Sequence, residues 1–177
     1  MEQAFERLAD MLGTAATRVG PNYFQLPVAA ADAMYRERVY CYELYHQIRE
    51  LWGDFPFSLG GEIDKSGHPS FVDGPYARAK PDLLIHTPGS MDENLAVVEV
   101  KPATTRQKGI RDDIRKLRWF HQNANYFVGV FLVYGEAGDP EIVAQRVRDS
   151  AAAQDDLESL VCLYHRHVGE RPERLQL

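Results

Sequence analysis

The chain has little cysteine, and no cluster of cysteine and histidine has the spacing of a zinc site. Its two cysteines, Cys41 and Cys162, lie in apolar segments, which favours two buried free thiols in a reducing compartment over a disulfide. No apolar run is long enough to cross a bilayer, and the first residues carry acidic side chains where a secretion signal would be apolar. We therefore expect a cytoplasmic protein that does not contact a membrane.

Excess positive charge is also lacking, because the 177 residues carry a formal net charge of -6. This balance disfavours a protein that coats nucleic acid by bulk attraction. The charge is unevenly spread, since the segment from Lys101 to His121 holds seven Lys or Arg against two acids. Such a run is usually a solvated helix face. Hydrophobic residues make up 45% and charged residues 26% of the chain, values typical of one globular domain over residues 1–177.

The apolar pattern predicts an α/β fold in which a central mixed β-sheet is flanked by helices. Helices are expected at residues 2–12, 32–52, 105–124 and 140–153. Strands are expected at residues 57–63, 82–86, 95–100, 126–134 and 157–165. Asp32 is the expected N-cap of the second helix, residues 65–80 form a loop, and the tail from residue 169 to residue 177 is loose.

The most informative motif is Pro81-Asp82, followed after sixteen residues by Glu99-Val100-Lys101. Glu99 and Lys101 lie two positions apart on one predicted strand. Because successive side chains of a strand point to opposite faces, these two share a face. If the strand that Asp82 opens is a neighbour, both carboxylates reach the same place. Carboxylate oxygens suit a hard cation such as Mg²⁺, and a nearby ammonium group can neutralise developing charge.

These residues resemble the PD-(D/E)XK nuclease superfamily, which has the restriction-endonuclease-like fold, over about residues 32–135. The resemblance implies a core of helix, three strands, helix and strand. It implies that Asp82, Glu99 and Glu43 bind Mg²⁺ or Mn²⁺, Glu43 from the first core helix, and that Lys101 assists them in catalysis. The phrase RVYCYELYHQIR also resembles small nuclease-like proteins linked to bacterial anti-phage defence.

The function that the resemblance implies is metal-dependent hydrolysis of phosphodiester bonds in DNA, and RNA stays open as an alternative substrate because nothing in the sequence decides between the two. The side chains expected to contact phosphate are Arg106, Lys108, Arg111 and Arg115. A homodimer is expected because so small a domain has little surface to grip a duplex. A partner subunit of a defence complex is the other expected assembly, in which the partner supplies the specificity.

An alternative keeps the fold without the catalysis: an inactive nuclease-fold subunit that binds a protein or nucleic-acid partner. The negative net charge favours it. Structural roles for single residues also stay open. Glu99 can form a surface salt bridge with Lys101, and Glu43 can pair with Arg36.

Overall fold

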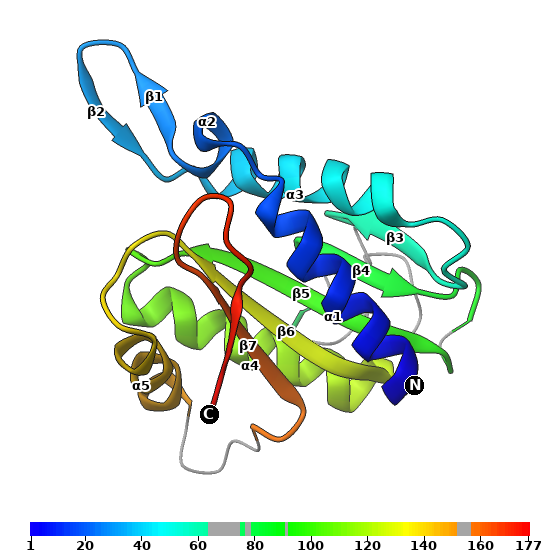
Figure 1. Cartoon of the computed structure of the whole chain (residues 1–177). Helices are drawn as coiled ribbons and strands as arrows, with labels where there is room; N and C mark the ends of the chain where they lie inside the picture. Colours follow the sequence, from blue (N-terminus) through cyan, green and yellow to red (C-terminus); the bar gives the residue numbers. More distant parts are fainter. Residues whose placement is uncertain (64–74, 77–78, 91, 152–156) are drawn as a thin grey trace.

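A six-stranded sheet forms the centre of the computed structural model, which describes residues 1–63, 75–76, 79–90, 92–151 and 157–177 (Figure 1). In spatial order its strands are β3 (Ser58–Gly61), β4 (Leu83–His86), β5 (Asn94–Pro102), β6 (Tyr126–Tyr134), β7 (Leu160–His165) and β8 (Glu173–Leu175). The β5–β6 and β6–β7 pairs are parallel and the other pairs are antiparallel. The predicted α/β class with a mixed sheet between helices is therefore confirmed.

Helices cover both faces of this sheet. The helices are α1 (Glu2–Thr17), α2 (Pro21–Phe24), α3 (Glu37–Leu51), α4 (Gln107–Ala124) and α5 (Pro140–Ser150). The apolar residues of α1 and α3 pack with Val98 and Val100 of β5, whereas those of α4 and α5 pack with Val97. Alternate residues of β5 thus enter opposite cores, as the period of two requires. Both cysteines are buried and free, as expected.

The helix expected at residues 32–52 is shorter than predicted, and Asp32 is not its N-cap. Asp32 belongs to β2 (Ala31–Met34), which pairs with β1 (Leu26–Val28) in a hairpin that projects from the body (Figure 1). Helix α3 begins only at Glu37, after Arg36 in an extended conformation. The ring of Tyr35 packs against Phe24 and Tyr134 at this point. These tertiary contacts outweigh the local helix propensity of the preceding residues.

The two ends of the chain also differ from expectation. Helix α1 continues through the buried Gly13, over which the guanidinium of Arg171 lies so closely that a β-carbon would force this flexible side chain to move. The tail is not loose, because β8 pairs with β7 and buries Leu175. Most of the expected loop at residues 65–80 lies outside the described residues.

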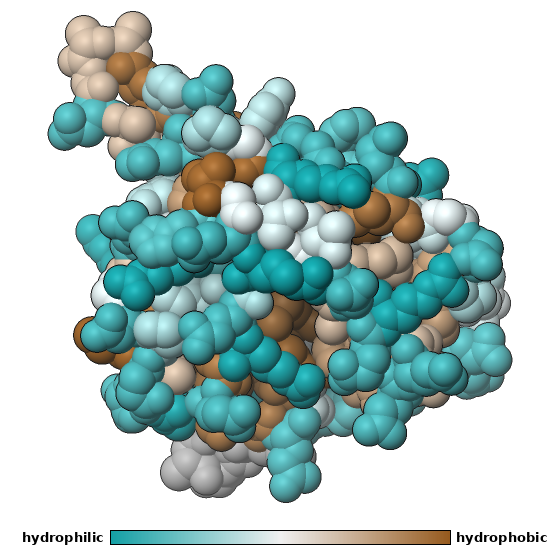
Figure 2. Space-filling view, viewed as in Figure 1, coloured by the Kyte–Doolittle hydropathy of each residue, from teal (hydrophilic) through white to brown (hydrophobic). Residues whose placement is uncertain are grey.

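The surface viewed in Figure 2 is largely hydrophilic, and the hairpin carries tan and brown, more apolar residues at its projecting end. No helix in the described parts of the chain is long and apolar enough to cross a membrane.

Candidate active site

Asp82 lies one residue before the first residue of β4, the strand that runs antiparallel to β5. Leu83 pairs with Val98, so continuing this register places Asp82 beside Glu99. The carboxylate accepts a hydrogen bond from the backbone N–H of Val100, with Oδ2 2.7 Å from the nitrogen. Burial raises the pKa of Asp82 to about 6, although the Val100 hydrogen bond and the positive charge of Lys101 oppose the shift.

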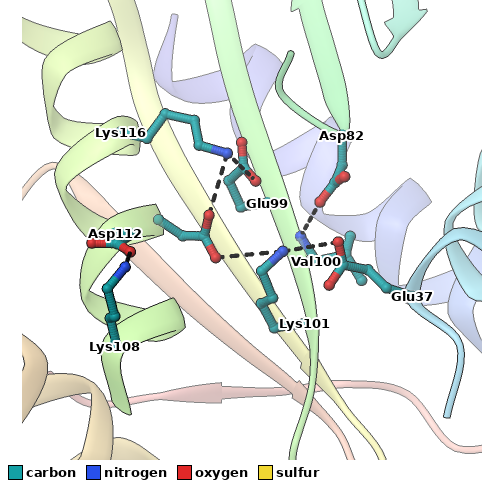
Figure 3. Close-up of polar contacts among 9 residues, drawn as sticks. Glu37, Asp82, Glu99, Val100, Lys101, Lys108, Asp112 and Lys116 are labelled. Carbon is teal, nitrogen blue, oxygen red and sulfur yellow. Dashed lines mark hydrogen bonds and ion pairs between the residues drawn. The ribbon is translucent and has the colours of Figure 1, made fainter. Parts of the chain in front are cut away.

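Glu99 is the most deeply buried acid of this region, with 1% of its side chain exposed. Its Oε2 lies 2.8 Å from Nζ of Lys116, which reaches it from α4 (Figure 3). Burial raises the pKa of Glu99 well above its ordinary value, and the negative charge of Asp82 raises it further. The other oxygen, Oε1, is buried and has no hydrogen-bond partner among the described residues. A buried carboxylate oxygen of this kind is suited to a cation.

Lys101 bridges the two helices that flank the end of β5. Its Nζ lies 2.8 Å from Oε1 of Glu37 on α3 and 3.5 Å from Oδ2 of Asp113 on α4. Burial lowers the pKa of Lys101, but the Asp113 charge and the hydrogen bond and charge of Glu37 outweigh burial, so the net pKa is raised. Lys101 therefore stays protonated at neutral pH and acts as a fixed positive charge.

Asp113 and Lys116 complete the cluster from one face of α4, three positions apart, with Asp113 Oδ1 3.2 Å from Lys116 Nζ. The cluster thus joins four carboxyl groups and two ammonium groups from the described residues. Its members are Glu37, Asp82, Glu99, Asp113, Lys101 and Lys116. With every group ionised, two negative charges remain uncompensated in a largely buried place, and such a surplus favours either protonation or a bound cation.

Glu43 is not brought to this cluster. Its Oε1 accepts a hydrogen bond from Nε2 of Gln47, one turn further along α3, at 2.7 Å. Across the described ranges no group of three or more His, Cys, Asp or Glu is arranged to hold a metal ion, so the expected ligand set of Asp82, Glu99 and Glu43 is not assembled. The residue of α3 that does join is Glu37, because it stands in the first turn, beside the end of β5.

The basic residues expected to contact phosphate lie around the first turns of α4. Arg106, Lys108, Arg111 and Arg115 are all exposed, unlike Lys116 on the inner face. Lys108 pairs with Asp112 on the same helix, Nζ to Oδ2 at 2.7 Å. Helix α4 therefore presents one basic side chain to the buried carboxylates and several to solvent.

Sequence reasoning missed Glu37, Asp113 and Lys116 as members of the site. A signal existed for Asp113, which falls within the apolar stripe of Ile110, Ile114 and Leu117 and is therefore an acid on a buried face. No such signal existed for Glu37, whose position depends on where α3 begins.

Comparison with models of protein families, with curated proteins and with solved structures finds no significant match to this chain.

Proposed function

We propose that the chain is a nuclease of the PD-(D/E)XK type, which hydrolyses DNA phosphodiester bonds with Mg²⁺ or Mn²⁺. The observation that carries this proposal is the cluster of four carboxyl groups and two ammonium groups around Asp82 and Glu99, together with the buried Oε1 of Glu99, which has no partner among the described residues. A divalent cation would hold these carboxylates ionised, balance their excess over the two ammonium groups and supply a partner for this oxygen. The residues present therefore fit a metal ion held by Asp82 and Glu99.

The order of secondary structure also supports a restriction-endonuclease-like core. Helix α3, strands β3, β4 and β5, helix α4 and strand β6 follow one another as helix, three strands, helix and strand. The three strands pair as antiparallel neighbours, and β6 joins β5 in parallel after the α4 crossover. This arrangement brings the Asp82 end of β4 to the middle of β5, where Glu99 lies.

Each residue of the cluster has a role in this proposal. When bound, the metal ion would polarise the phosphate and acidify a water molecule. Lys101, held protonated by Glu37 and Asp113, neutralises negative charge as it develops on the phosphate. Lys116 holds the Glu99 carboxylate in place from α4. Glu37 positions Lys101, which is not the metal-binding role expected of Glu43.

The exposed basic residues of α4 are assigned to the DNA backbone. Replacing Arg111 and Arg115 with glutamine should weaken DNA binding at low salt and lower the slope of log affinity against log salt by roughly one for each phosphate that the variant no longer neutralises. A filter-binding titration at several salt concentrations measures that slope.

Cleavage of labelled DNA in the presence of Mg²⁺ or Mn²⁺ tests the central assignment. Glu99→Gln keeps the shape of the side chain but removes its charge, so it should abolish metal-dependent cleavage. Glu43→Gln is the matched control, because Glu43 is an acid outside the cluster, and it should cleave as the parent does. Equal cleavage by Glu99→Gln and the parent would falsify the assignment. An RNA strand of the same sequence, tested in parallel, decides the substrate.

The alternative function is a non-catalytic subunit of the same fold that binds a protein partner. The observation that favours it is the projecting hairpin of β1 and β2, which carries no Lys or Arg and exposes small apolar side chains. Calorimetry with Mg²⁺ separates the two proposals. If the parent binds Mg²⁺ and both Asp82→Asn and Glu99→Gln weaken that binding, the result supports the nuclease. If no heat of binding is measured at millimolar Mg²⁺, the result supports the non-catalytic subunit.

A further inference from the structure

A pocket of about 320 Å³ opens beside Asp82, between α3 and the adjoining ends of β3 and β4. Its lining includes Cys41, Tyr42, Tyr45, Gly61, Glu62 and Asp82. Gly61 leaves its part of the wall open: a β-carbon there would make ordinary contacts, 3.6 Å from the ring of Tyr45 and 3.7 Å from the carbonyl oxygen of Asp82, and a larger side chain would extend beyond it. This volume lies at the small end of the range for ligand pockets, and so suits one small ring system.

Aromatic rings dominate the helix side of this pocket. Tyr42 and Tyr45 lie three positions apart on α3 and so share a face of the helix. Tyr42 is 59% exposed, which is a large exposed fraction for an aromatic side chain on a rigid element. An exposed ring of this kind offers a flat surface on which another ring can stack.

The charged side chains that line the pocket are both acceptors when ionised. Asp82 and Glu62 are both acids, and no Lys or Arg among the described residues lines the pocket. Glu62 is paired with Arg38, whose Nε lies 3.3 Å from Oε1 of Glu62. Glu62 is held at φ 47°, a strained conformation for a residue other than glycine, of the kind found at ligand-binding sites. The pocket therefore disfavours an anion and favours a neutral planar ring that carries N–H donors, which describes a nucleobase.

We propose that this pocket binds an unpaired nucleobase next to the phosphate that is cleaved at Asp82, so that the substrate is a single strand or a frayed end. The proposal rests on the proposed nuclease function, because it uses Asp82 as the shared boundary of pocket and site. A base within an intact duplex cannot enter, since it must first leave its stack. Stacking on tyrosine is tolerant of sequence, so little base preference is expected.

Binding of a short single-stranded DNA oligonucleotide tests the proposal in the Glu99→Gln background, which prevents cleavage during the measurement. Tyr42→Ala should weaken binding by about 5- to 150-fold, the range expected when one base no longer stacks on an aromatic ring. Tyr42→Phe should bind as the parent does. Tyr23→Ala is the matched control, because Tyr23 is 47% exposed on α2 and does not line the pocket. An oligonucleotide with abasic sites should bind Tyr42→Ala and the parent equally.

A second variant fills the pocket and leaves Tyr42 in place. Gly61→Val should weaken binding of the same oligonucleotide, and the fluorescence of a 2-aminopurine base in it should no longer be quenched on binding. Unchanged affinity in both Tyr42→Ala and Gly61→Val overturns the proposal. If the protein cleaves duplex DNA independently of Tyr42, the pocket assignment fails and the nuclease stands. If binding depends on Tyr42 but no metal-dependent cleavage occurs, the pocket stands and the nuclease fails.

Discussion

Ionisation of Asp82 should oppose folding, and the substitution Asp82→Asn measures by how much. Burial raises the pKa of this carboxyl from 3.8 to about 6. Between about pH 4 and pH 6 the folded protein therefore binds a proton more tightly than the unfolded chain does. The contribution of Asp82 to the free energy of unfolding therefore falls as the pH rises from about 4 to about 6, and it is lost above pH 6.

The size of the effect follows from the shift. Two pKa units correspond to about 3 kcal/mol, and because Asp82 is only partly buried, solvent screening reduces this to about 1–2 kcal/mol. Asparagine can still accept the hydrogen bond from the N–H of Val100, so the substitution removes the charge alone. With a chelator present to remove divalent metal, the Asp82→Asn variant should be more stable than the parent by about 1–2 kcal/mol at pH 8 and equally stable at pH 4.

Urea unfolding followed by circular dichroism between pH 4 and pH 8 measures this difference. A difference between parent and variant that does not change with pH would refute the reasoning, because it would mean that Asp82 ionises alike in both states. Added Mg²⁺ provides a second readout: at a hundred times its dissociation constant it should stabilise the parent by about 2.7 kcal/mol, and Asp82→Asn much less.

Three further predictions concern residues around and away from this cluster. Lys116→Met should lower the free energy of unfolding by about 3 kcal/mol in urea, because it removes the ammonium group that pairs with the buried Glu99, and adding Glu99→Gln should restore most of the stability. Burial lowers the pKa of His165 to about 4, so its contribution to stability should be complete above pH 6.5 and should disappear as the pH falls towards 4, and a His165→Phe variant should lack that slope in acid unfolding. Gly129→Ala should cost about 1–3 kcal/mol in thermal unfolding, because its β-carbon would lie 3.0 Å from that of Leu117; a melting temperature equal to the parent's would contradict that packing.

The regular parts of the fold follow from local patterns. The nearly continuous apolar run at residues 95–100 predicts a strand buried on both faces, and β5 is that strand. The apolar stripe beginning at Ile110 predicts α4, whose end at Ala124 is set by Asn125 in a left-handed conformation. Both elements are stabilised by burial of their own apolar side chains, so the spacing of those side chains along the sequence is enough to predict them.

Two short strands that depend on distant partners were wrongly predicted. Residues 31–34 have a local pattern typical of a helix but pair with β1, and the C-terminal tail has the polar composition of a loose segment but pairs with β7. Each of these two segments gains its stability as a strand from the neighbour that it meets, and its own residues do not record that neighbour.

By itself the sequence determined that Glu99 and Lys101 share a face of a strand, because side chains alternate along any strand. It also determined that Asp82 stands at the start of the strand before. Only the tertiary structure decided which charges meet them. Glu37, Asp113 and Lys116 come from helices whose starting points and rotation against the sheet depend on core packing, and Glu43 is excluded for the same reason.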